Sequence, residues 1–152
     1  MFLKRSVNLT SHSGLTLHHV GYVVAEIEPI SKIYVERYGY KIVTPIIHDP
    51  VQTAFVQFLQ LAGDPSYLEF VAPDGPASKL ARAAAKTPGL NHLCYSTDDI
   101  EEWTNRLYDS GMRPLSLPTP AVAFGGRKVS WLMGRDRLAV ELVERSGVPG
   151  EL

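Results

Sequence analysis

The chain has 152 residues, 45% of them hydrophobic and 20% charged, which is the balance of an ordinary folded protein. Its formal net charge is −1 and its Lys and Arg residues are scattered, so we expect neither a nucleic acid nor a membrane as a partner. A single cysteine excludes an internal disulfide, and no apolar run approaches the roughly 20 residues of a membrane span. Residues 1–14 form a polar tail without the apolar core of a signal peptide, which predicts a cytoplasmic protein.

The first half of the chain, residues 15–74, predicts a strand, a helix and three further strands. The first strand is rich in Val and Tyr. The helix runs from about Glu28 to Tyr38, because Pro29 is tolerated in a first turn, where its missing N–H needs no partner. Gly39 can adopt the left-handed conformation that ends a helix. The strands are expected at 17–25 and near 40–47, 53–61 and 66–72.

The remainder of the chain repeats this order after an Ala-rich connection, residues 75–89, which predicts a short helix over 76–86. Within residues 90–146, a helix is expected from a cap at Asp98 or Asp99 to Ser110, before Gly111. Residues 147–152 close the chain as a tail. The second set of strands is expected at 90–96 and near 112–117, 127–133 and 138–144, with an irregular loop at 117–120 and a turn at Gly125-Gly126.

The two halves match each other at a nearly constant offset. Leu17-His18-His19 stands 73 positions before Leu90-Asn91-His92, and Leu68–Val71 stands 72 positions before Val140–Val143. A repeat of this length fixes the architecture, because each copy forms one structural unit. We therefore predict an α+β fold in which two tandem βαβββ modules form a curved mixed sheet around one central cavity.

The duplicated polar residues are one His on the first strand and one Glu on the last strand of each half. They are His19, Glu69, His92 and Glu141. A carboxylate in an apolar strand is costly unless it is paired or bound to a metal. If the halves are related by a pseudo-twofold axis, the four side chains meet at one divalent cation. Two imidazoles and two carboxylates suit Zn, Ni, Co or Mn, with Fe(II) less favoured, better than Ca or Mg.

Each of these residues also has an ordinary explanation. A single His on a strand is more often a hydrogen-bonded core residue than a ligand, and a single Glu on a strand usually lies at an edge. Only the duplication favours a metal site. His18 competes with His19 but is expected on the opposite face of its strand, and the match to His92 selects His19. His12 and His48 have no counterparts and are expected at the surface.

Four segments, LHHVGYVV, SYLEFVAP, LNHLCYSTDDIEE and LAVELVE, resemble the vicinal oxygen chelate superfamily, the family of glyoxalases, bleomycin resistance proteins and dioxygenases. The resemblance extends from about Leu15 to Glu144 and is strongest to members that resemble methylmalonyl-CoA epimerase or glyoxalase I. It implies the same four metal ligands from one chain. By analogy it also implies a homodimer.

Two departures from the epimerases count against methylmalonyl-CoA as the substrate. The epimerases carry a second acid before their third strand, where this chain has Val51 and Gln52, and neither His48 nor Asp49 is in register to replace it. They also have a longer stretch before the last strand than the WLMGRDRL found here.

The expected reaction is proton transfer at a carbon alpha to a carbonyl, through a metal-stabilised enediolate, as in lactoylglutathione lyase or methylmalonyl-CoA epimerase. Glu141 is the expected base and Glu69 the second catalytic candidate. Arg127 and Lys128 are candidates to bind an anionic tail of a carbonyl or thioester substrate, although solvated turn residues are the commoner explanation.

Cys94 is expected in the core, because no group that would activate its thiol is evident. Tyr22, Tyr67 and Tyr95 are candidates to line the cavity. Three alternatives stay open. One is an Fe(II) extradiol-type dioxygenase, against which a fourth protein ligand counts. Another is a non-catalytic resistance protein that binds a small molecule, against which an intact ligand set counts. The third is a structural or regulatory domain with a vestigial site.

Overall fold

The computed structural model describes residues 14–148 and 150–152, so His12 and almost all of the predicted N-terminal tail lie outside the described residues. The elements of the first half are β1 (Thr16–Val23), α1 (Ile27–Tyr38), β2 (Lys41–Ile42), β3 (Ile47–Asp49), β4 (Ala54–Gln60) and β5 (Tyr67–Pro73). A short helix α2 (Ala81–Lys86) follows. The second half contains β6 (Gly89–Thr97), α3 (Ile100–Asp109), β7 (Arg113–Pro120), the 3-10 turn η1 (Val122–Phe124), β8 (Lys128–Met133) and β9 (Ala139–Glu144).

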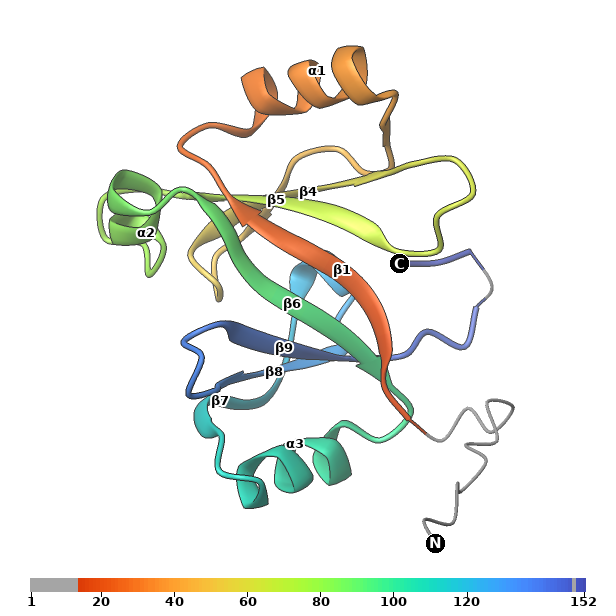
Figure 1. The fold of residues 1–152 in the computed structure, drawn as a ribbon, viewed down its shortest axis with the longest axis vertical. Coiled ribbons are helices and arrows are strands. Elements are labelled where there is room, and N and C mark those ends of the chain that lie inside the picture. Colours follow the sequence, from red (N-terminus) through yellow and green to blue (C-terminus); the bar gives the residue numbers. More distant parts are fainter. Residues whose placement is uncertain (1–13, 149) are drawn as a thin grey trace, which may run out of the picture.

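The nine strands of the described residues form one mixed sheet, in the order β2-β4-β5-β1-β6-β9-β8-β7 with β3 also paired to β4. The first strands of the two halves, β1 and β6, run antiparallel through its middle, and each pairs in parallel with the last strand of its own half. Figure 1 shows the sheet curling away on both sides of this central pair, with α1 and α3 on its outer sides. This arrangement confirms the predicted fold class.

Three apolar clusters hold the sheet and helices together, and two of them are equivalent. The helices α1 and α3 are amphipathic, and each packs its apolar residues onto the outer face of its own half of the sheet. The third cluster fills the inner, concave face with side chains from both halves. Its buried members are Val23, Ala54, Val56, Phe58, Val71, Cys94, Ala121, Phe124, Val129 and Val143. Leu152 packs against this inner cluster, so the end of the chain lies on the inner face of the sheet.

The helix ends follow their sequence signals. Asp99 caps α3, since its side chain accepts a hydrogen bond from the Glu102 N–H at 2.9 Å. Gly39 ends α1 in the left-handed region, with φ of 77°, and its N–H donates to the Val35 carbonyl. In the described part of the chain no helix is long and apolar enough to cross a membrane.

Three predicted elements differ from the structure. The strand expected near 40–47 is two short strands, because Pro45 lies between β2 and β3 and cannot donate a ladder hydrogen bond. The loop expected at 117–120 instead continues β7 to Pro120, which is possible because an edge strand tolerates prolines that face away from the ladder. The connecting helix is confined to Ala81–Lys86, since the preceding residues form turns.

Candidate metal centre

The structure brings His19, Glu69, His92 and Glu141 together at the centre of the sheet. They lie on β1, β5, β6 and β9, the four central strands, and one ligand atom from each lies within 4.8 Å of the others. Their exposed fractions are 0%, 5%, 1% and 4%. The residues next to Glu69 and Glu141 along each strand, Phe70 and Leu142, pack toward the helices instead. Alternation along β5 and β9 therefore aims both carboxylates inward.

The spacing of the ligand atoms fits a single cation. The two His Nε2 atoms lie 3.0 Å apart, and Glu69 Oε2 lies 3.1 Å from His19 Nε2 and 3.0 Å from His92 Nε2. Glu141 Oε2 lies 3.2 Å and 3.6 Å from the same two nitrogens. Ligands about 2.0–2.2 Å from an ion are about 3.3–3.6 Å apart in a tetrahedron and about 3.0 Å apart at adjacent octahedral positions. The donor set and its spacing therefore suit a divalent transition metal.

One carboxylate is held more loosely than the other. Glu69 Oε2 is close to both imidazoles, whereas Glu141 Oε2 is buried and makes no hydrogen bond of acceptable geometry within the described structure, despite its 3.2 Å approach to His19. A buried acceptor without a partner is unfavourable, and a bound cation would satisfy it. The orphaned oxygen is thus an independent sign that a positive group belongs here.

The electrostatics of the centre point the same way. Burial alone would lower the pKa of His19, but the adjacent Cys94 and the Glu69 and Glu141 carboxylates outweigh it and raise that pKa well above 6.5. Burial would raise the pKa of Glu69, but His19 and His92 outweigh it and lower that pKa to about 2. A proton on His19 therefore supplies positive charge beside the carboxylates, in the position that a cation would take.

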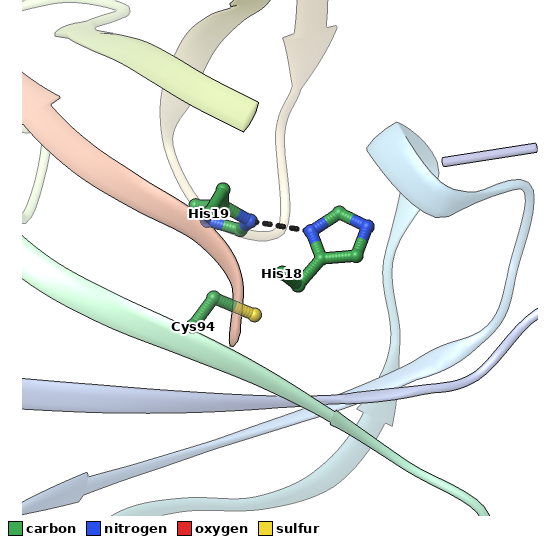
Figure 2. A group of neighbouring side chains, drawn as sticks. All are labelled: His18, His19 and Cys94. Atoms are coloured by element: carbon green, nitrogen blue, oxygen red, sulfur yellow. Dashed lines mark hydrogen bonds between the residues drawn. The ribbon is translucent and has the colours of Figure 1, made fainter. Parts of the chain in front are cut away.

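His18 does not lie where alternation predicts. In β1, Leu17 pairs with Tyr95 and His19 pairs with Cys94, so His18 is an extra residue in a β-bulge. The bulge turns its ring to the same side as that of His19, and the two Nδ1 atoms lie 2.8 Å apart (Figure 2). The prediction that His18 occupies the opposite face is therefore wrong, because the bulge interrupts the alternation.

Cys94 joins His18 and His19 in a second group of close ligand atoms (Figure 2). Its side chain is fully buried, and burial raises the pKa of its thiol, which therefore stays neutral. Burial and the neighbouring His19 lower the pKa of His18 to about 3, so its ring is neutral as well. The predicted core position of Cys94 is confirmed, and the group shares His19 with the four-residue centre.

Gly21 lies against a candidate ligand and was not singled out from the sequence. The His92 ring lies directly over its backbone, and a Cβ placed on Gly21 would stand 1.9 Å from His92 Cε1. Gly21 pairs with His92 across the two central strands, as Cys94 pairs with His19. The available signal was the repeat itself, since Gly21 matches Cys94 at the offset of 73. Only a residue without a side chain leaves room for this imidazole.

An aromatic ring covers each imidazole from the strand two positions away in the sheet, Phe58 on β4 for His19 and Trp131 on β8 for His92. The ring centres of Phe58 and His19 lie 5.3 Å apart, and those of Trp131 and His92 lie 4.7 Å apart, both edge to face. Of the tyrosines expected around a cavity, Tyr67 packs on the inner cluster. Tyr22 and Tyr95 instead pack with the outer clusters beneath α1 and α3, so the expectation is wrong for these two.

The remaining candidates lie outside the four-residue group. Lys128 Nζ pairs with Glu101 on α3 at 2.9 Å. Arg127 donates to the backbone carbonyls of Phe124 and Glu144. His48 is exposed, as expected, and its Nε2 lies 3.0 Å from Asp74 Oδ2. Asp49 is buried, but its Oδ1 accepts the N–H groups of the following turn at 3.0–3.1 Å. That Arg127 and Lys128 bind substrate stays a prediction.

Comparison with known proteins identifies the family of this chain. Residues 18–131 match the Glyoxalase/Bleomycin resistance protein/Dioxygenase superfamily. The chain belongs to this superfamily. Among curated members, it is 29% identical over 122 residues to the ethylmalonyl-CoA/methylmalonyl-CoA epimerase of Cereibacter sphaeroides, covering 79% of this chain and 89% of that protein.

Solved structures of other superfamily members share the fold. A variant of the Streptomyces coelicolor methylmalonyl-CoA epimerase, in complex with 2-nitronate-propionyl-CoA, aligns with a TM-score of 0.77, covering 88% of this chain and 100% of that one at 22% identity. The methylmalonyl-CoA epimerase of Mycobacterium tuberculosis aligns with a TM-score of 0.75, covering 91% and 94% at 22% identity. At 22% identity these two structures show only that this chain has the same fold.

Proposed function

We propose that this superfamily member is a metal-dependent isomerase or lyase that moves a proton at a carbon alpha to a carbonyl. The observation that carries the proposal is the convergence of two imidazole nitrogens and two carboxylate oxygens, all from one chain, at spacings that suit one divalent cation. Zn, Ni, Co and Mn suit this donor set best. A bound ion would supply positive charge for the substrate oxygen that becomes negative as the proton leaves.

The two carboxylates have different proposed roles in the proton transfer. Glu141 is the proposed base, because its Oε2 is the less firmly held of the two and has no hydrogen bond to lose when it accepts a proton. Glu69 is the second candidate and comes from the opposite half of the sheet. Burial excludes water from both groups, which strengthens their electrostatic interactions with a substrate.

The curated relative favours an acyl-CoA thioester as the substrate class, since it is an epimerase of ethylmalonyl-CoA and methylmalonyl-CoA. Asp49 is engaged by backbone N–H groups and His48 by Asp74, so neither replaces the second acid that the epimerases place near Val51 and Gln52. We therefore assign the second acid to Glu69 and expect a 2-substituted acyl thioester. The hemithioacetal of methylglyoxal and glutathione is the alternative substrate.

Two measurements test this proposal. Elemental analysis of the purified protein is expected to give about one transition metal per chain, and Glu141→Ala is expected to lose it. The metal-loaded protein is expected to exchange the α-hydrogen of ethylmalonyl-CoA or methylmalonyl-CoA with deuterium from solvent. Turnover of the hemithioacetal alone would instead assign lyase activity.

The two competing functions give different results in the same assays. An iron-loaded sample that consumes O₂ with a catechol, without deuterium exchange, would assign extradiol-type dioxygenase chemistry. Protein that binds no metal but binds small apolar compounds would assign a resistance-type binding protein. The homodimer and the cytoplasmic location that the sequence favours stay predictions. Light scattering of the purified protein tests whether it is a homodimer.

A further inference from the structure

The residue immediately before each candidate ligand His lies in a β-bulge. On β1 the unpaired residue is His18, between Leu17 and His19. On β6 it is Asn91, because Leu90 pairs with Tyr22 and His92 pairs with Gly21. His18 and Asn91 are equivalent positions, 73 residues apart. The central strand pair thus contains two bulges, one beside each imidazole, related by the same pseudo-symmetry as the ligands.

The side chain of each bulge residue lies within hydrogen-bond distance of Nδ1 of the imidazole that follows it. Asn91 Oδ1 lies 2.8 Å from His92 Nδ1, and His18 Nδ1 lies 2.8 Å from His19 Nδ1. Both His Nε2 atoms lie at the centre, so an imidazole that binds a cation there through Nε2 carries its ring proton on Nδ1. Asn91 Oδ1 is an acceptor, and a neutral His18 ring can accept at Nδ1 while it carries its own proton on Nε2.

Packing alone does not account for His18. Its Nε2 atom is buried and has no hydrogen-bond partner within the described structure, which is unfavourable for an N–H group. Its ring packs among Phe58, Tyr67 and Phe124, where an apolar side chain would suit the surroundings better. The Nδ1 contact to His19 is the one interaction of this ring that needs an imidazole or another acceptor.

We propose that His18 and Asn91 are positioning residues, which accept the Nδ1–H of His19 and His92 and so present both Nε2 lone pairs to one cation. The inference rests on the proposed metal function. A hydrogen-bond acceptor behind a ligating imidazole fixes its tautomer and ring orientation and makes its other nitrogen a better ligand. The β-bulge is the device that makes this possible, because in a regular strand adjacent side chains point to opposite faces.

The test compares substitutions that keep or remove the acceptor. His18→Asn copies the residue that the other half uses, whereas His18→Leu and Asn91→Leu provide no acceptor. His48→Leu is the matched control, since it makes the same change at an exposed histidine away from the centre. Zinc affinity is measured by competition with a chromophoric chelator. The two acceptor-free variants are expected to bind zinc about 10–100-fold more weakly, and His18→Asn and His48→Leu about as tightly as the parent protein.

A second readout reports the hydrogen bond itself. Long-range proton–nitrogen NMR of the ¹⁵N-labelled protein is expected to show slowly exchanging Nδ1 protons on His19 and His92. The His19 signal should disappear in His18→Leu and persist in His18→Asn, even if one variant is less stable. Unchanged zinc affinity in both Leu variants, or His18→Asn as weak as His18→Leu, would overturn the proposal.

The NMR measurement also separates this inference from the proposed function. If the parent protein binds no zinc, the proposed metal function fails. The Nδ1 protons of the metal-free protein then still decide whether His18 and Asn91 act as acceptors. Imidazole protons found on Nε2 instead would overturn the assignment whatever the metal content.

Discussion

The two halves of the chain have equivalent hydrogen bonds between helix and strand but form them with different side chains. On the outer face of each half of the sheet, a helix hydroxyl contacts a polar residue on the facing strand: Ser31 donates to Gln57 at 2.6 Å, and Thr104 and Ser130 lie 2.8 Å apart. These pairs stand at the same offset of 73. This hydrogen bond between helix and strand is thus a second duplicated feature. It links each helix to its own half of the sheet, away from the candidate metal centre.

Nearer the centre the two halves diverge. Gly21 leaves room for the ring of His92, while its counterpart Cys94 fills the space beside His19. Glu69 approaches both imidazoles within 3.1 Å, while Glu141 is looser on one side. The four candidate ligand atoms keep the pseudo-symmetry, as the binding of one cation would require, whereas the surrounding side chains differ. The proposed catalytic role of Glu141 depends on the difference between the two carboxylates.

The largest expected effect tests the difference between the carboxylates. Glu141→Gln is expected to slow α-hydrogen exchange by about 10²–10⁴-fold, because an amide cannot accept the substrate proton. Glu69→Gln is expected to weaken metal binding and, at saturating metal, to keep the exchange that Glu141 catalyses but to lose inversion of the α-carbon, because the proposed second acid is removed. The measurements are deuterium exchange and inversion of the α-carbon as a function of metal concentration. Inversion that survives in Glu69→Gln at saturating metal would show that Glu69 is not the second acid.

The next comparison is between Gly21 and Cys94. Gly21→Ala is expected to displace the His92 ring, lower the free energy of unfolding by about 1–3 kcal/mol and weaken metal binding, because the new methyl group overlaps the imidazole. Cys94→Ala removes one buried sulfur at the equivalent position and is expected to leave metal affinity nearly unchanged. Urea unfolding and zinc competition measure the two effects. Tight zinc binding by Gly21→Ala would mean that His92 is not a ligand.

A smaller change in stability is expected at the duplicated hydrogen bonds between helix and strand. Ser31→Ala leaves the Gln57 carbonyl oxygen buried without its hydroxyl donor, which is expected to cost about 1–3 kcal/mol of unfolding free energy. Ser130→Ala is expected to cost about 1 kcal/mol, because a hydroxyl pair is the weaker interaction. Both values follow from the midpoints of urea unfolding, provided that the slope of unfolding free energy against urea concentration is unchanged. Lys32→Ala, on the exposed side of the same helix, is the control and is expected to have no effect.

The smallest effect is expected at the turn before β8. Lys128→Ala removes an exposed ion pair with Glu101 and is expected to leave thermal stability unchanged. Arg127→Ala removes two hydrogen bonds to backbone carbonyls and should lower the thermal midpoint slightly. Both variants are assayed for the Michaelis constant of the thioester. A several-fold increase in either variant would confirm that the residue binds the anionic part of the substrate.

Much of the fold and of the candidate site followed from local pattern and repetition. Hydrophobic alternation on the last strands aimed Glu69 and Glu141 to one side, and the offset of 73 selected His19 over His18. Capping chemistry placed the end of α1 at Gly39 and the start of α3 at Asp99. These features could be predicted because each depends on residues close together in the chain, or on the equality of the two halves.

The tertiary structure alone decided how the two central strands meet. Whether a strand contains a bulge depends on its register against a partner, and the partner of β1 in the second half is about 73 residues away along the chain. That register places His18 beside His19, Asn91 beside His92, and Gly21 beneath the His92 ring. Alternation within one strand contains no such information. The sequence by itself therefore determined which four residues could bind a cation, and strand pairing decided which side chains lie beside them.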